Sequence, residues 1–249
     1  MTNIKFSIKD TELLEHRSYY AEIPRSVLLL PDGSRRFAKN RAKAGENITP
    51  RDLYDIGQRK CQDFLEICFN EYGLDTCSIF FLRPTSFELQ RRSNENLEAI
   101  LIAINKLALN ILNGKTNLNP DGIYIHTITL AEKPWMYKPD RVDRSKDLSE
   151  KWNDLTETLN KLRSLPKKDK TINFLIHYSG KRELDFALEG NPLQIHEQIG
   201  VVIRTGDGIR LSDCPLYALS EAHLHLIPKY LPETTKDDFR ETLAHYFTA

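Results

Sequence analysis

The sequence predicts an α/β fold in which a central, mostly parallel sheet is flanked by helices. Short apolar runs alternate with longer amphipathic segments, which is the pattern of strands joined by helical crossovers. Several of these runs stop abruptly at turn residues, as strands buried on both faces do. No repeat, low-complexity tract or linker indicates a second domain. We therefore expect one domain over residues 1–249, with residues 1–24 as an N-terminal extension.

Six apolar runs are predicted to be strands, at 26–30, 77–82, 122–129, 171–177, 199–204 and 223–227. The first shows the pattern best, because four aliphatic residues from Val27 to Leu30 end at Pro31-Asp32-Gly33. Ligands of open α/β sheets lie just outside the carboxyl ends of the strands. Polar residues that directly follow these runs are therefore candidate site residues.

Four amphipathic segments are predicted to be helices, at 49–72, 91–112, 147–163 and 235–246. Each carries apolar residues at helical spacing, so one face can pack on the sheet. The first segment begins with Thr49-Pro50, a suitable N-cap and first-turn pair. The expected order of elements thus alternates strands with helices along most of the chain.

The composition excludes several classes of function. Lys and Arg total 35 and Asp and Glu total 35, so nucleic acid or an acidic membrane is not expected as the main partner. The four cysteines form no C-x-x-C pair, which favours a reducing, cytoplasmic setting. The N-terminus lacks the apolar core of a signal peptide, and no stretch reaches about 18 apolar residues. We expect no integral membrane segment.

The first polar cluster follows the strand at 26–30. Asp32 is followed by three cations, Arg35, Arg36 and Lys39. A carboxylate next to cations could hold a metal ion and phosphate groups at the edge of the sheet. An ordinary surface turn is the alternative interpretation of this segment.

The second polar cluster, RTGDGIRLS at 204–212, follows another apolar run. Arg204 and Arg210 lie six residues apart, with Thr205, Ser212 and a glycine-containing loop around them. Guanidinium groups match phosphate oxygens and loop N–H groups add donors, so this segment is a candidate diphosphate clamp. Gly-Asp-Gly is also a common turn sequence, which is the competing interpretation.

Both clusters resemble the signature motifs of the cis-prenyltransferase family, to which undecaprenyl diphosphate synthase belongs. The family's first motif, D-G-N-G-R-W-A-K, appears as DGSRRFAK at 32–39, and its last, I-R-T-G followed by R-L-S, appears at 203–206 and 210–212. Between them, RRSNENLEAI at 91–100 and NFLIHYSGKRE at 173–183 resemble two further motifs. These motifs occur in the same order as in the family, and the resemblance covers the chain from about residue 25 to the C-terminus.

The resemblance implies a homodimeric α/β fold with an apolar tunnel, formed here by 49–72 and 91–112. It also implies that Mg²⁺ assists the coupling of allylic and isopentenyl-type diphosphates, with Asp32 as a metal ligand. The residues that it assigns to the two diphosphates are Gly33, Arg35, Arg36, Lys39, Ser86, Arg204, Thr205, Arg210 and Ser212. Cations and a hard metal ion suit this chemistry, because ionisation of an allylic diphosphate releases a pyrophosphate anion.

The sequence departs from the family pattern at several positions. Ser34 replaces the asparagine of the first motif, and Tyr54 replaces the histidine of the following helix. The segment TSFELQ at 85–90 keeps Ser86 but lacks the family's Asn-Trp pair, and His223 stands where the family has a metal-binding glutamate. With these changes the chain is similar to the cyclolavandulyl and lavandulyl diphosphate synthases, which join prenyl units irregularly.

We therefore expect a non-elongating prenyltransferase or terpene-forming enzyme with Asp32, Ser34, Arg36 and Tyr54 as catalytic candidates and Asp32 and His223 as metal ligands. It would ionise dimethylallyl, geranyl or farnesyl diphosphate (C5–C15) with Mg²⁺. The prenyl group would then join a second prenyl diphosphate, such as isopentenyl diphosphate, or cyclise. One alternative is an ordinary chain-elongating synthase. Another is an inactive partner subunit, although such subunits typically lose the first-motif Asp and the clamp arginines that this chain keeps.

Overall fold

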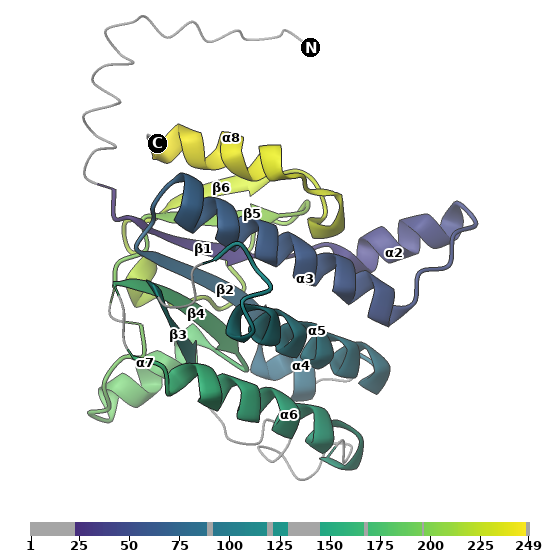
Figure 1. Ribbon diagram of the computed structural model, residues 1–249, viewed down its shortest axis with the longest axis horizontal. Helices are drawn as coiled ribbons and strands as arrows, with labels where there is room; N and C mark the ends of the chain where they lie inside the picture. The colour runs from purple at the N-terminus through teal and green to yellow at the C-terminus, as the bar shows by residue number, and fades with distance from the viewer. Residues whose placement is uncertain are drawn as a thin grey trace, which may run out of the picture.

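A computed structural model describes residues 23–88, 92–118, 122–128, 145–166, 169–195 and 197–247. In these residues six strands form one sheet in the order β3-β4-β2-β1-β5-β6, and all neighbouring strands are parallel (Figure 1). The strands are β1 Ser26–Leu30, β2 Thr76–Leu82, β3 Ile123–Ile128, β4 Lys170–Ile176, β5 Val201–Thr205 and β6 His223–Ile227. The predicted fold class is confirmed. Nearly all of the predicted extension at 1–24 lies outside the described residues.

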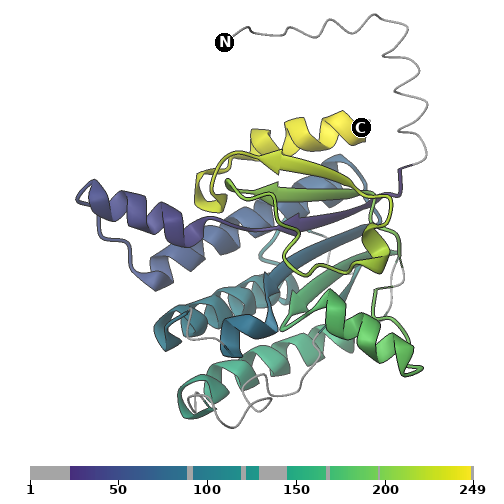
Figure 2. The same ribbon diagram turned by 180° about the vertical axis from the view of Figure 1, so that it is seen from behind.

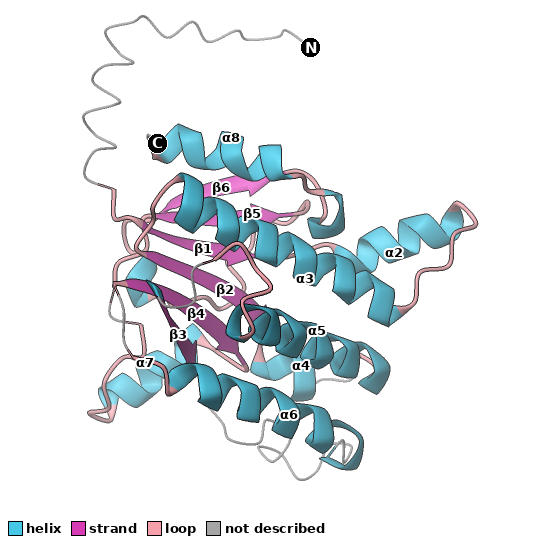
Figure 3. Cartoon of the chain, in the orientation of Figure 1, coloured by secondary structure: helices cyan, strands magenta, loops and turns pink. Residues whose placement is uncertain are grey.

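Helices connect the strands and cover the sheet (Figure 3). They are α2 Ser34–Lys43, α3 Pro50–Glu66, α4 Pro84–Glu88, α5 Asn94–Leu112, α6 Ser145–Arg163, α7 Gly180–Leu188 and α8 Lys236–Tyr246. A π-helical segment, Ile67–Glu71, continues α3, and 3₁₀ turns lie at Tyr217–Leu219 and Leu231–Glu233. Thr49 caps α3 as predicted, because its Oγ1 accepts a hydrogen bond from Asp52 N at 3.2 Å.

The two faces of the sheet have separate cores. Helices α3, α5, α6 and α8 cover one face, where residues such as Phe64, Leu101 and Phe239 form the larger core (Figure 1). Figure 2 shows the opposite face, which carries α7 and the segments around β5 and β6. The smaller core on that face includes Leu28 and Val202. No helix in the described part of the chain has the length and apolar character needed to cross a membrane.

Three helices are absent from the prediction, and each has a physical reason. Helix α2 reads SRRFAKNRAK and buries Phe37 alone, so it has almost no apolar periodicity to detect. Helix α4 has five residues and α7 has nine, and short helices carry few periodic positions. The strand boundaries differ from the prediction by no more than two residues.

The sheet topology brings the two predicted clusters together. Strands β1 and β5 are parallel neighbours, and Leu30 is paired with Arg204. The residues that follow each strand, Asp32 after β1 and the loop after Thr205, therefore meet at one edge of the sheet. The carboxyl edge of a parallel sheet is where such folds bind ligands.

Candidate active site

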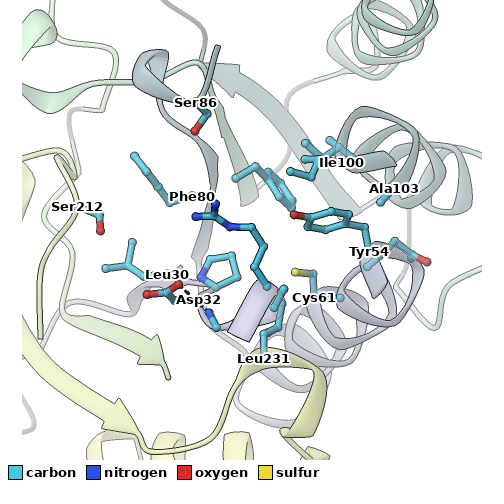
Figure 4. A pocket seen from close by; sticks show the side chains of 18 of the residues that line it. Leu30, Asp32, Tyr54, Cys61, Phe80, Ser86, Ile100, Ala103, Ser212 and Leu231 are labelled. Atoms are coloured by element: carbon cyan, nitrogen blue, oxygen red, sulfur yellow. Dashed lines mark hydrogen bonds between the residues drawn. The ribbon is translucent and has the colours of Figure 1, made fainter. Parts of the chain in front are cut away.

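A pocket of about 570 Å³ opens at the carboxyl edge of the sheet and continues between α3 and α5. Its volume lies in the range of small-molecule sites. The predicted site residues that line it are Asp32, Gly33, Ser34, Arg35, Arg36, Lys39, Tyr54, Ser86, Arg204, Arg210 and Ser212. Segments that lie far apart in the sequence thus contribute to one site. In Figure 4, Asp32 and Ser212 lie on one side of the pocket and Tyr54, Ile100 and Ala103 on the other.

Asp32 is held at the end of β1 through both its backbone and its carboxylate. Its backbone N–H donates to Thr205 Oγ1 at 2.8 Å, and the same hydroxyl donates to the Asp32 carbonyl at 3.0 Å. Its Oδ1 accepts from Gly33 N at 2.7 Å. Gly33 has a φ of 91°, and a Cβ there would collide with the ring of Tyr230. This glycine therefore allows the turn that aims Asp32 at the pocket.

Arg204 is the buried cation beside Asp32. Its side chain is 4% exposed, and its Nη2 forms an ion pair with Asp32 Oδ2. Its Nε donates to Gly208 O at 2.6 Å, and Nη1 donates to Arg210 O and to Ser212 Oγ, the latter at 3.1 Å. Burial lowers the pKa of the Arg204 guanidinium and the Asp32 charge opposes this shift. Residues 206–212, called the clamp loop below, are therefore folded around the side chain of Arg204.

Arg36, in the first turn of α2, places a second guanidinium group next to Asp32. Its Nη2 lies 3.1 Å from Asp32 Oδ2, its Nη1 pairs with Asp207 of the clamp loop, and its Cζ lies 5.4 Å from the centre of the Tyr230 ring. Its side chain is 41% exposed, so a ligand in the pocket can reach it. Arg36 therefore links α2, the clamp loop and the segment after β6 at the rim of the pocket.

The N-terminus of α2 opens onto the same rim. The helix begins at Ser34 directly after Gly33, without a side-chain cap from that residue and without acidic residues in its first turn. The first N–H groups of a helix have no acceptor within the helix, and the helix dipole favours an anion there. Lys39, one helical turn further along, also lines the pocket. These features suit a phosphate group.

The inner part of the pocket is apolar. Tyr54, Gly57 and Cys61 line it from α3, and residues from Ile100 to Leu107 line it from α5. Burial raises the pKa of the Cys61 thiol to about 12, so Cys61 acts as an apolar wall. The lining on α3 from Tyr54 to Cys61 covers about 10 Å of helix axis. Beyond it, Phe64 and Leu65 are fully buried in the core and do not line the pocket.

Tyr54 lines the pocket between its cationic rim and its apolar inner part. Its Oη accepts a hydrogen bond from Arg92 Nη1 at 3.0 Å and donates to Asn96 Oδ1 at 3.4 Å. Burial lowers the pKa of Arg92, and the charges of Arg35 and Arg83 lower it further, while Tyr54 opposes the shift. The tyrosine is therefore fixed in place by α5 and the segment that precedes it.

Two predicted site residues lie elsewhere than expected. The Thr205 hydroxyl is buried and bonds the Asp32 backbone, so in this structure it positions Asp32 and does not line the pocket. His223 pairs with Val201 at the start of β6, and its ring lies 5.5 Å from that of Tyr246. The structure does not bring His223 to Asp32 within one chain, because Asp32 lies at the other end of the neighbouring strands.

Three polar pocket residues are missing from the prediction: Gln58, Arg83 and Arg92. Arg83 directly follows β2, so it carries the same signal as Asp32, a polar residue at the end of an apolar run. Arg92 lies inside the RRSNENLEAI motif. Gln58 is a buried polar residue on an otherwise apolar stretch of α3, and no sequence signal identifies it.

The family model for undecaprenyl diphosphate synthase matches residues 30–249, which include every segment of this pocket. The chain belongs to the undecaprenyl diphosphate synthase family of prenyltransferases. Among curated members of the family, the tritrans,polycis-undecaprenyl-diphosphate synthase (geranylgeranyl-diphosphate specific) of Pyrococcus abyssi is 22% identical, and the match covers 90% of this chain and 84% of that protein. The dehydrodolichyl diphosphate synthase 1 of Arabidopsis thaliana is 26% identical, with 90% and 74% covered.

A solved member of the family shares the fold. The lavandulyl diphosphate synthase of Lavandula x intermedia, crystallised in complex with dimethylallyl diphosphate, superposes with a TM-score of 0.65 at 18% identity. The superposition covers 91% of this chain and 96% of that one. The predicted relationship to the cis-prenyltransferases is therefore confirmed, as is the similarity of the fold to a lavandulyl-type synthase.

The donor set around Asp32 fits Mg²⁺ together with a diphosphate. The described residues contain no group of three or more His, Cys, Asp or Glu side chains arranged to hold a metal ion. Mg²⁺ is commonly bound by one or two carboxylates, with substrate phosphates and water completing its shell. Asp32 supplies one carboxylate, 36% exposed, at a rim where Arg36 and Arg204 can hold phosphate oxygens.

Proposed function

We propose that this chain is a non-elongating prenyltransferase or terpene-forming enzyme that ionises a short allylic diphosphate of five to fifteen carbons. The double bond of a second prenyl diphosphate then attacks the prenyl cation irregularly, or a double bond of the same chain attacks it in a cyclisation, and the resulting cation loses a proton. One observation carries the proposal: the cationic rim around Asp32 continues into an apolar pocket that ends about 10 Å along α3. Such a pocket suits a diphosphate with a short tail. The dimethylallyl diphosphate in the lavandulyl synthase complex is a ligand of this kind.

Ionisation breaks the bond between the allylic carbon and the diphosphate oxygen, and the pyrophosphate leaves with both electrons. Arg36, Lys39 and the first N–H groups of α2 would bind this leaving group as its negative charge increases. Mg²⁺, held by Asp32 and the diphosphate, would supply further charge neutralisation when bound. Arg210 and Ser212 would bind the second diphosphate on the clamp loop that Arg204 holds in shape.

The cation would form where the rim meets the apolar part of the pocket. Tyr54 lines this region, and an aromatic ring face stabilises a nearby positive charge. Ser34, the first residue of α2, provides the hydroxyl next to Asp32 on the rim. Apolar side chains such as Ile104 and Leu107 exclude water from the tail, which protects the cation from hydrolysis.

The first prediction concerns the product. The purified protein with Mg²⁺ is incubated with dimethylallyl, geranyl or farnesyl diphosphate, each with and without isopentenyl diphosphate, and extracts are analysed by mass spectrometry before and after phosphatase treatment. We expect one short product, because the apolar lining of the pocket extends for only about 10 Å along α3. A series of products differing by five carbons would contradict the proposal and support ordinary elongation, the activity named for the Pyrococcus relative.

Absence of product from every pair of substrates would contradict the catalytic proposal and favour an inactive partner subunit. The geometry argues against that alternative. Asp32, Arg36 and Arg204 are retained, both arginines form ion pairs with Asp32, and Arg210 lines the same pocket. A chain without a catalytic role has no need of three charged groups held around one pocket.

We also propose that the chain forms a homodimer through the outer edge of the sheet. In the described residues β6 is an edge strand, and Leu224 and Leu226 on it are 41% and 38% exposed. Leu224 is paired with Val202 of the smaller core, so both leucines lie on that face of the sheet. Leu216 and Tyr217, also exposed, precede the strand. A second copy of the chain can cover these side chains at the open edge.

The second prediction tests this dimer. Leu226→Lys is expected to convert the protein to a monomer, because it places a charge in the apolar contact. Light scattering coupled to gel filtration measures the mass. Leu188→Lys is the matched control: Leu188 is 88% exposed at the end of α7 and is expected to leave the mass unchanged. A wild-type protein that is monomeric at micromolar concentration would contradict the proposal.

A further inference from the structure

Arg83 is a pocket cation that the site described above does not use. It directly follows β2, which ends at Leu82 and lies next to β1 in the sheet. Arg204 is on β5, the other neighbour of β1. The turn at Asp32 is therefore flanked on each side by an arginine from an adjacent strand. Both arginines line the pocket.

The surroundings of Arg83 are cationic. In the parts of the chain that the structure describes, the Arg83 side chain makes no hydrogen bond and no ion pair, while its carbonyl oxygen accepts a hydrogen bond from Ser86 N at 2.9 Å. Its charge, with that of Arg35, lowers the pKa of Arg92, which also lines the pocket. On the other side, burial raises the pKa of the Cys214 thiol to about 12, and the charges of Arg204 and Arg83 oppose that rise. Arg83 thus lies within electrostatic reach of both Arg92 and the end of the clamp loop.

Like charges gathered in a half-buried pocket repel one another, and an anion that binds between them removes this cost. A guanidinium group presents a planar set of donors that matches phosphate oxygens in two-point contacts. The clamp loop, with Arg210 and Ser212, faces the same pocket and ends next to Cys214. Arg83 lines the same pocket as Arg210 from the end of β2 and is therefore placed to take part in binding a diphosphate there.

We propose that Arg83 is a further substrate-binding residue, a second cation for the second prenyl diphosphate beside Arg210 and the hydroxyl of Ser212. This inference rests on the proposed function, since it requires a diphosphate at the clamp loop. It goes beyond that function by giving the second diphosphate a contact on β2, next to the edge where the allylic diphosphate binds. Both diphosphates would then be held on a rigid sheet edge, which keeps the two reacting carbons close.

The third prediction tests Arg83 by direct binding and by kinetics. Titration calorimetry with inorganic pyrophosphate and Mg²⁺ is carried out on the wild type, Arg83→Met and Arg83→Lys. We expect Arg83→Met to weaken binding by about tenfold, since one charge-assisted phosphate contact is lost, and Arg83→Lys to recover part of the affinity. Arg59→Met is the control, because Arg59 is an exposed residue of α3 that does not line the pocket. It should bind like the wild type.

Kinetics assign the contact to one of the two diphosphates. For Arg83→Met we expect the KM of the second substrate to rise by about tenfold, and the KM of the allylic donor to stay within about twofold. Pyrophosphate binding that is equal in Arg83→Met and the wild type would overturn the inference while leaving the proposed function intact. A rise confined to the KM of the donor would overturn the assignment to the clamp. A wild type that does not bind pyrophosphate would overturn both proposals.

Discussion

Asp32→Asn is expected to lower the turnover of every allylic diphosphate by about a hundred- to a thousandfold and to leave the fold intact. The substitution keeps the shape of the side chain but removes the charge that would hold Mg²⁺ on the leaving diphosphate. The asparagine keeps one oxygen, which can accept from Gly33 N or from Arg204 but not from both, because these donors contact different oxygens of Asp32. The kcat with saturating Mg²⁺, and the Mg²⁺ concentration that gives half-maximal rate, measure the effect.

Asp32→Ala is a less specific probe, because Arg204 is 4% exposed and would lose its carboxylate partner. We expect that variant to lose about 1–2 kcal/mol of unfolding free energy as well as activity, since three other acceptors of Arg204 remain. Comparing the two variants by chemical denaturation separates the loss of catalysis from the loss of stability.

A matched carboxylate serves as control for Asp32. Asp207 also pairs with Arg36, but it is 58% exposed and does not line the pocket. Asp207→Asn is expected to change kcat by less than about fivefold, as an exposed ion pair contributes little. If Asp32→Asn and Asp207→Asn lowered kcat to the same extent, Asp32 would have no special part in ionisation.

The sequence predicts much of this fold because the sheet is parallel and buried. Strands such as β1 must be apolar throughout, so they stand out as short runs that end at polar turns. Because parallel strands end at the same edge of a sheet, Asp32 and Arg204, which end two such runs, can be predicted from the sequence to lie at one edge. Helix α3 is recognisable from its cap at Thr49 and its apolar face. Periodicity and turn chemistry are therefore sufficient for the framework and for the charged centre of the site.

Other features depend on which strands become neighbours, and sequence patterns do not determine this. Arg83 lies near Asp32 in the pocket because β2, which Arg83 follows, is the neighbour of β1 in the sheet. His223 matches a family position by sequence, but the register of β6 against β5 places it opposite Val201, three residue pairs before Arg204. Helix α2 carries the rim cations with a single buried residue, so its apolar pattern is too weak for the sequence to reveal it as a helix.

Arg204→Met is expected to raise the KM of a diphosphate substrate by at least about tenfold and to lower the free energy of unfolding by about 2–4 kcal/mol. Both effects follow from one side chain. Its guanidinium donates to Gly208 O, Arg210 O and Ser212 Oγ and forms an ion pair with Asp32. Without it, the half-buried acceptors on the loop lose their donor, and the clamp loop loses the group around which it is folded.

Arg210→Met separates the two effects, because the Arg210 side chain is exposed and only its backbone carbonyl contacts Arg204. We expect it to raise the KM in the same way but to change the unfolding free energy by less than about 0.5 kcal/mol. Arg204→Lys keeps the charge but has one point of donation where the guanidinium has several, so it should behave more like Arg204→Met than like the wild type. Wild-type KM and stability in Arg204→Lys would mean that charge alone matters at this position, and the clamp would then owe its shape to the loop backbone.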